Sequence, residues 1–134
     1  MGLPGAGKTT LAEELRLKLW EEGRTVSWLN ADEVRKTHDD WDFSTEGRIR
    51  QSVRMKDLAD KATTDYVIAD FIAPLVEMRI NFKPDWIVWV DTIQQSKFID
   101  TDIIFIPPTD FEYDFRVTEQ NAEQWSKIIA NTII

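Results

Sequence analysis

The chain has 134 residues, of which 43% are hydrophobic, so it is long enough for one folded domain with its own core. It has no cysteine, which excludes a disulfide framework and thiolate metal sites and fits a reducing, cytoplasmic setting. The net charge of −8 argues against a nucleic-acid or anionic-membrane partner, and no stretch approaches the roughly 20 apolar residues of a membrane span.

The chain opens with a glycine-rich stretch, "GLPGAGKT", which matches the phosphate-loop pattern G-x-x-x-x-G-K-[ST]. Glycines permit the tight turn that aims successive backbone N–H groups at phosphate oxygens, at the start of a helix. The lysine of such a loop reaches the β- and γ-phosphates, and the threonine hydroxyl ligates Mg²⁺. The predicted ATP-binding residues are Gly2, Leu3, Pro4, Gly5, Ala6, Gly7, Lys8, Thr9 and Thr10.

The next segments alternate between helical and strand patterns. Leucines at four-residue steps predict an amphipathic helix over 10–22, stopped by Gly23. The apolar run "TVSWLNA" (25–31) predicts a strand, and the polar stretch after it predicts a short helix and a loop. Ser44 is predicted to cap a second long helix. The residues expected near one face of that helix are Ile49, Val53 and Ala59.

Three apolar runs in the second half predict buried strands: "DYVIADFIA" (65–73), "DWIVWVDT" (85–92) and "DIIFIPP" (102–108). Pro74 suits the opening turn of a helix through Arg79. Thr118 is predicted to cap a terminal helix with an apolar stripe. Strands that alternate with helices predict an α/β protein with a three-layer P-loop NTPase fold, a mostly parallel sheet with helices on both faces. The stripe comprises Ala122, Trp125, Ile129 and Ile133.

Two further features narrow the chemistry. Asp32 follows the strand beside the loop, where a carboxylate can orient Mg²⁺ or take a proton from an acceptor hydroxyl. The alternative interpretation of Asp32 is a helix N-cap. Farther on, "FSTEGRIRQSVR" places Arg48 and other basic residues after Phe43, a combination that can hold a planar base together with a phosphate or sulfate. Phe43 fits a core position equally well.

Four stretches resemble the adenylylsulfate kinases, P-loop enzymes that phosphorylate the 3′-hydroxyl of adenosine 5′-phosphosulfate with MgATP. They are "GLPGAGKTTLA", "NADEVR", "FSTEGRIRQSVR" and "FIAPLVEMR", in the order and spacing of that family. The resemblance implies that Lys8 and Asp32 are catalytic and that Thr9 and Asp32 bind the metal. It implies anion-holding roles for Arg35 and Arg48 and a pair of aromatics around the acceptor adenine. The implied acceptor site is Arg35, Phe43, Arg48, Gln51, Ile72 and Phe98.

The chain also departs from the family pattern. The family motif D-G-D is Asn30-Ala31-Asp32, the serine of F-I-S-P is Ala73, and the arginine after Pro74 is Val76. The long basic lid of the family is reduced to "TIQQSKFIDTD". Lids exclude water during phosphoryl transfer, so two alternatives stay open. One is a kinase for another acceptor, such as a nucleoside, a polynucleotide end or a sugar; the other is a nucleotide-binding protein without catalysis.

The loop begins at residue 2, whereas the strand that feeds such a loop in P-loop kinases lies in the middle of the sheet. We expect one P-loop kinase domain over residues 1–134 whose first strand is missing before Met1, so that two strands lack their shared neighbour. The predicted ligands are ATP, Mg²⁺ and a small nucleotide acceptor, and a homodimer is an open possibility.

Overall fold

A computed structural model describes all 134 residues, and its helices and strands alternate along the chain. The four strands are β1 (Val26–Asn30), β2 (Tyr66–Asp70), β3 (Val88–Val90) and β4 (Phe115–Val117). The six helices are α1 (Lys8–Glu21), α2 (Ala31–His38), α3 (Thr45–Lys61), α4 (Val76–Phe82), α5 (Ile99–Ile104) and α6 (Ala122–Ile133). This content confirms the predicted α/β class.

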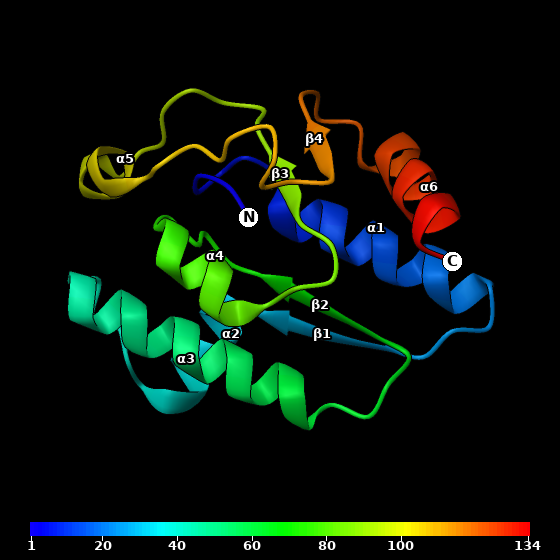
Figure 1. Cartoon of the computed structure of the whole chain (residues 1–134), viewed down its shortest axis with the longest axis horizontal. Helices are drawn as coiled ribbons and strands as arrows, with labels where there is room; N and C mark the ends of the chain where they lie inside the picture. Colours follow the sequence, from blue (N-terminus) through cyan, green and yellow to red (C-terminus); the bar gives the residue numbers. More distant parts are fainter.

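The helices cover two sides of the strands (Figure 1). Helices α1 and α6 pack against each other on one side, while α3 packs with α2 and α4 on the other. The centre of the core joins the leucines of α1 to the apolar stripe of α6, through Leu11, Leu15, Leu19 and Ile129. The leucine repeat of α1 and the apolar stripe of α6 are therefore confirmed as buried faces. Their contact holds α1, the helix that follows the glycine-rich loop, in place.

The strands form two separate parallel pairs, β1 with β2 and β3 with β4. The first two residues of the chain lie between the pairs. The amino group of Met1 donates to the Val88 oxygen (2.8 Å), and the Val90 N–H donates to the Met1 oxygen (2.9 Å). The Gly2 N–H donates to the Ile72 oxygen, just beyond β2 (3.3 Å). Met1 and Gly2 thus connect the two pairs at the end of the strands that faces the loop.

An apolar gap lies between β2 and β3 behind these two residues. It is a cavity of about 440 Å³ whose walls include Leu15, Ile68, Val88 and Ile129. Burial lowers the pKa of the Met1 amino group from 8.0 to about 5, and the nearby Lys8 charge acts in the same direction. The extent of the domain and the absence of a first strand stay predictions.

The segment 102–108 is not a strand, contrary to prediction. Its first residues belong to α5, where the Asp102 carboxylate accepts hydrogen bonds from the Ser96 N–H and hydroxyl. Ile103 is 76% exposed, so the apolar run is not buried. The fourth strand is instead β4, a three-residue segment that the sequence analysis missed because Arg116 interrupts its apolar pattern; Arg116 pairs with Asp91 at 2.8 Å.

The predicted face of α3 is also wrong. Ile49 and Val53 are exposed, and the buried residues of this helix include Arg48, Gln51 and Met55. Helix α3 therefore turns largely polar side chains inward, because it forms one wall of a polar cavity as well as packing on the strands. Its cap is as predicted, since the Ser44 hydroxyl accepts from the Gly47 N–H at 3.2 Å.

Two helix starts differ from the prediction. Helix α4 begins at Val76 after an N-cap at Leu75, so Pro74 lies just outside it. Helix α6 is capped by Asn121 rather than Thr118, because the Asn121 side chain accepts from the Gln124 N–H. Both helices nevertheless exist, so the apolar patterns located them and only their first turns were misplaced.

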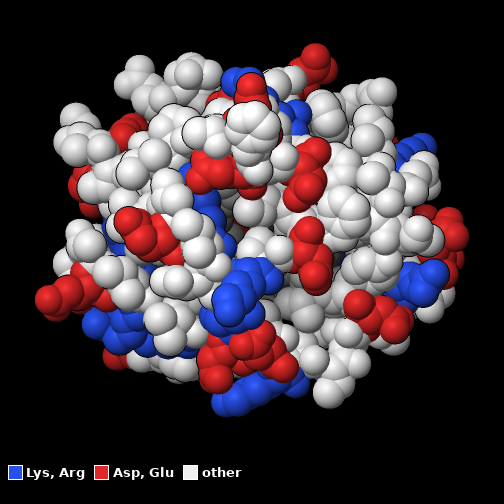
Figure 2. Space-filling view, in the orientation of Figure 1, with Lys and Arg blue, Asp and Glu red and all other residues white.

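Charged residues make up 30% of the chain. Acidic and basic residues are interspersed across the face seen in Figure 2. None of the helices is long and apolar enough to cross a membrane.

Candidate active site

The glycine-rich loop adopts the backbone conformation that its sequence requires. Gly5 and Gly7 have φ values of 82° and 103°, a region that strains any residue with a side chain. Gly7 is the N-cap of α1, and no side chain caps the helix there. The N–H groups at the start of α1 are therefore left for a ligand, at the end of the helix that favours negative charge.

Lys8 lies across the loop that contains it. Its ammonium donates to the Leu3 oxygen at 2.8 Å. Burial lowers the pKa of Lys8, whereas the nearby charges of Asp70 and Asp32 raise it. The lysine is thus held against the loop, with its pKa lowered overall and two carboxylates near enough to act on its charge.

Thr9 meets the ends of both strands of the first pair. Its hydroxyl donates to the Asp70 carboxylate at 2.9 Å, and the Asn30 amide donates to the same carboxylate oxygen at 2.9 Å. Asp70 is 6% exposed. The sequence analysis missed this residue because it predicted the strand to run from 65 to 73, whereas β2 ends at Asp70.

Asp32 lies in the first turn of α2 and is exposed to the same cavity. The interpretation of Asp32 as an N-cap is wrong, because the Asn30 side chain caps this helix by accepting from the Glu33 N–H at 3.1 Å. The Asp32 carboxylate has no hydrogen-bond partner within the protein, so it is available to a ligand.

Two buried arginines flank Phe43 on the opposite side of the cavity. The guanidinium carbons of Arg35 and Arg48 lie 4.3 Å and 5.5 Å from the centre of the Phe43 ring. Arg48 donates to the Phe43 oxygen at 2.8 Å and to the Thr101 hydroxyl at 2.9 Å. Burial lowers the pKa of both guanidinium groups. Arg35 forms no ion pair, although the Asp40 charge acts on it, and the one acid that Arg48 reaches, at 3.5 Å, is 68% exposed.

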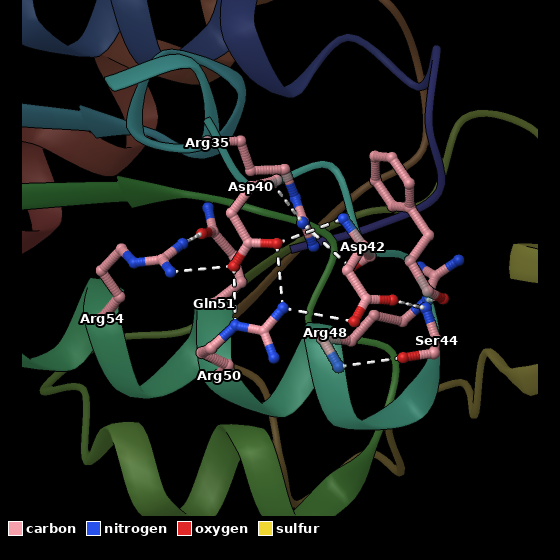
Figure 3. Close-up of polar contacts among 10 residues, drawn as sticks. Arg35, Asp40, Asp42, Ser44, Arg48, Arg50, Gln51 and Arg54 are labelled. Atoms are coloured by element: carbon pink, nitrogen blue, oxygen red, sulfur yellow. Dashed lines mark hydrogen bonds and ion pairs between the residues drawn. The ribbon is translucent and has the colours of Figure 1, made fainter. Parts of the chain in front are cut away.

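The loop that carries Phe43 is held by a second group of charges (Figure 3). The Asp40 carboxylate accepts from Arg50 at 2.7 Å and from Arg54 at 2.9 Å, and the Asp40 carbonyl accepts from Arg35 at 3.0 Å. Arg50 first and Arg54 second hold the pKa of Asp40 well below its usual range. Arg35 and Arg48 therefore line the cavity and donate to carbonyls of this loop, whereas Arg50 and Arg54 pair with its carboxylates and lie outside the cavity lining.

One cavity of about 640 Å³ brings the two groups together. It is lined by most of the predicted residues: Pro4, Gly5, Gly7, Lys8, Thr9, Thr10, Asp32, Arg35, Phe43, Arg48, Gln51, Ile72 and Phe98. Three residues of the predicted loop, Gly2, Leu3 and Ala6, do not line the cavity, because they are buried on the inner side of the loop. The assignment of these three to ATP rested on the motif as a whole, which includes residues that support the loop from below.

A family model for adenylylsulphate kinase matches residues 1–99. The chain belongs to the adenylylsulphate kinase family. An adenylyl-sulfate kinase of Clostridium acetobutylicum is 36% identical over 86 residues, which are 61% of this chain and 42% of that protein. The match therefore spans less than half the length of this curated relative.

Solved structures support the same fold. The Mycobacterium tuberculosis APS kinase CysC, in complex with AMPPNP and APS, superposes with a TM-score of 0.82 at 22% identity over 98% of this chain and 92% of that one. A shikimate kinase from Acinetobacter baumannii in complex with shikimate has a TM-score of 0.65 at 20% identity, over 98% and 89% of the two chains. The predicted P-loop kinase fold is thus confirmed.

Proposed function

We propose that this protein transfers the γ-phosphoryl group of MgATP to the 3′-hydroxyl of adenosine 5′-phosphosulfate. The observation that carries the proposal is the single cavity in which the phosphate loop faces the Arg35, Phe43 and Arg48 group. A kinase must hold two anionic substrates together and exclude other arrangements, and this cavity has a separate cationic element for each.

The loop side suits a triphosphate. Its free backbone N–H groups and the Lys8 ammonium offer donors to phosphate oxygens, and Lys8 adds charge where the transferred group becomes more anionic. Mg²⁺ is a hard cation that neutralises the β- and γ-phosphate charge when it is bound with ATP. The oxygen atoms of Thr9 and Asp32, both at this side of the cavity, are the ligand type that it prefers.

The opposite side suits a nucleotide with a second anion. The Phe43 ring offers a stacking surface, and Arg35 and Arg48 retain positive charge for a phosphosulfate. Asp32 lies between the two sides, where its carboxylate accepts the proton of the attacking hydroxyl. Ala73 offers no hydroxyl for a phosphorylated intermediate, so transfer is direct from ATP to the acceptor.

The test is ADP formation from MgATP with a panel of acceptors: adenosine 5′-phosphosulfate, adenosine, an oligonucleotide with a free 5′-hydroxyl, and a sugar. We expect turnover with adenosine 5′-phosphosulfate, with the new phosphate at its 3′ position by NMR. Turnover with another acceptor alone would reassign the substrate. ATP binding without turnover on any acceptor would make the protein a nucleotide-binding member of the family.

A further inference from the structure

Arg79 is a buried cation that the proposed reaction leaves unused. It lies on α4, is 5% exposed and does not line the cavity that contains the phosphate loop. Burial lowers its pKa, and the charge of Glu112 acts in the opposite direction. A buried charge without a paired carboxylate is costly, so packing alone does not account for an arginine at this position.

The guanidinium donates to main-chain carbonyls of two segments that are distant in the sequence. Nε donates to the Ala73 oxygen at 2.9 Å, and Nη2 donates to the Pro74 oxygen at 3.3 Å and to the Ile106 oxygen. The Ile106 N–H also donates to the Pro74 oxygen, at 2.9 Å. The planar fork of an arginine suits this arrangement, because it presents several donors at fixed angles. Arg79 therefore joins the turn after β2 to the chain that follows α5.

The ring of Phe105 packs on the same guanidinium. Its centre lies 5.5 Å from the guanidinium carbon, within the range of a cation–π contact. The remaining nitrogen, Nη1, is sealed from solvent and has no hydrogen-bond partner. The contacts that hold the charge thus come from the two segments that Arg79 joins.

The turn that accepts from Arg79 has a strained backbone. Ala73 has a φ of 49°, in the left-handed region that residues with a side chain rarely adopt. Such a conformation persists when surrounding contacts fix it, and the hydrogen bond from Nε to the Ala73 oxygen is one of these contacts. Ile72, Ala73 and Pro74 all line the polar cavity. Arg79 therefore fixes backbone that forms one wall of the site.

The other segment carries part of the predicted acceptor side. Phe98 and Thr101 line the same cavity at the start of α5. Arg48 holds this start from α3, through the Thr101 hydroxyl at 2.9 Å, and Arg79 holds the chain just beyond α5 from α4. Two of the three isoleucines of α5 are exposed, so apolar packing contributes little to holding the helix. The position of α5 therefore depends largely on these two buried arginines.

We propose that Arg79 is a positioning residue for the acceptor. It does not touch the ligand, but it holds α5, with Phe98 and Thr101, against the 72–74 turn, so that both segments line the acceptor side of the cavity. This inference rests on the proposed function, because it assigns the wall that α5 forms to the acceptor rather than to ATP. It requires that loss of Arg79 change acceptor binding more than it changes the stability of the fold.

The experiment compares Arg79→Met with Arg79→Lys and with a control in the core. Methionine fills the buried position but supplies no donor, and lysine keeps a charge but not the planar fork. Ile129→Ala is the control for lost stability, because it leaves a void between α1 and α6, outside the polar cavity. Calorimetry measures the affinities for ATP and for adenosine 5′-phosphosulfate, thermal melting measures stability, and hydrogen exchange follows residues 98–106.

We expect Arg79→Met to weaken binding of adenosine 5′-phosphosulfate about tenfold and to change ATP affinity less than about twofold, since charged hydrogen bonds are lost on one side of the cavity only. Exchange of residues 98–106 should become faster. The melting temperature should fall less than in Ile129→Ala, because removal of an uncompensated buried charge offsets the lost hydrogen bonds. Arg79→Lys should recover only part of the acceptor affinity.

Phe105→Leu leaves Arg79 in place and removes the ring on which it packs. Acceptor affinity should fall about two- to fivefold in this variant, as expected for one cation–π contact. It keeps the test decisive if Arg79→Met folds poorly by circular dichroism.

Two results would overturn the inference: equal acceptor affinity in Arg79→Met and the wild type, or a loss of acceptor affinity in Ile129→Ala as large as that in Arg79→Met. A wild type that binds ATP but not adenosine 5′-phosphosulfate would instead refute the proposed function. In that case unchanged exchange of residues 98–106 in Arg79→Met would overturn the positioning role as well, and faster exchange would support it.

Discussion

The phosphate loop separates two cavities of opposite character. Above it lies the polar cavity of about 640 Å³, where Lys8, Asp32 and the buried arginines leave charge available to ligands. Beneath it lies the gap of about 440 Å³ between β2 and β3, whose walls are mostly apolar side chains. Lys8, Asp70, Phe71 and Ala73 border both cavities. Substitutions in the polar cavity above the loop should therefore alter catalysis and binding, whereas substitutions in the apolar gap beneath it should alter stability.

The largest effect is expected for Lys8→Ala. Loss of one preorganised cation at the transferred phosphoryl should lower kcat by about 10²–10³-fold, or about 2.7–4 kcal/mol in the barrier. The melting temperature should change little, because the ammonium makes a single hydrogen bond to the loop. Steady-state kinetics and calorimetric melting measure the two quantities. Lys127→Ala, at an exposed lysine of α6, is the control; wild-type turnover in Lys8→Ala would remove the loop from the mechanism.

The next effect concerns the gap beneath the loop. Five apolar residues added before Met1 should enter the gap as an extended strand beside β3. The backbone of Met1 already bonds to β3, since its amino group donates to the Val88 oxygen and its carbonyl accepts from the Val90 N–H. Each buried apolar side chain contributes about 1.5–3 kcal/mol and ordering each residue costs about 1–2 kcal/mol, so we expect a net gain of about 2 kcal/mol. Denaturant unfolding measures it.

A Gly/Ser extension of equal length is the control, because it removes the terminal charge without filling the gap. The 134-residue chain should also gain stability from pH 5 to pH 8. Over that range the unfolded amino group of Met1 is protonated while the folded one, with a pKa of about 5, is not, so the unfolded state binds more protons. Both extended chains should lose this dependence. Equal stability of the apolar and Gly/Ser extensions would show that the gap accepts no strand.

A smaller effect is expected on the acceptor side. Phe43→Ala and Arg48→Ala should each raise the acceptor KM roughly tenfold, since each removes a stacking or charged contact, and leave the KM for ATP nearly unchanged. Initial rates with each substrate varied in turn make the distinction. Equal losses for ATP and acceptor would mean that these residues only maintain the fold.

The smallest effect is expected for Asp40→Asn, which weakens the ion pairs that hold the Phe43 loop. Partly exposed pairs contribute little, so the acceptor KM should rise only about two- to fivefold. Hydrogen exchange of residues 39–44 should become faster, because the Asp42 N–H donates to the Asp40 carboxylate. Asp57→Asn breaks an exposed pair elsewhere on α3 and should change neither quantity. Unchanged exchange in Asp40→Asn would show that the loop is held by other contacts.

Much of the site was readable from the sequence because its motifs are local. The glycine spacing, Lys8 and Thr9 require only neighbouring residues and the helix that follows, and the leucine repeat of that helix located its buried face. Asp32 and Phe43 were selected from their positions after predicted elements, Arg35 was selected from the family resemblance, and all three line the cavity.

Other features depended on contacts between distant segments. Asp70 meets Thr9 across 61 positions, and Arg48 reaches Thr101 across 53, so no local pattern marks either contact. The errors in predicting α5 and the buried face of α3 also concern features that depend on distant segments. In α5 an apolar run forms an exposed helix, and in α3 the apolar face points to solvent while Arg48 and Gln51 face the polar cavity. Local spacing by itself determined the loop and its helix; only the tertiary structure brought Asp70 to Thr9 and Thr101 to Arg48, since burial and charge compensation act between segments.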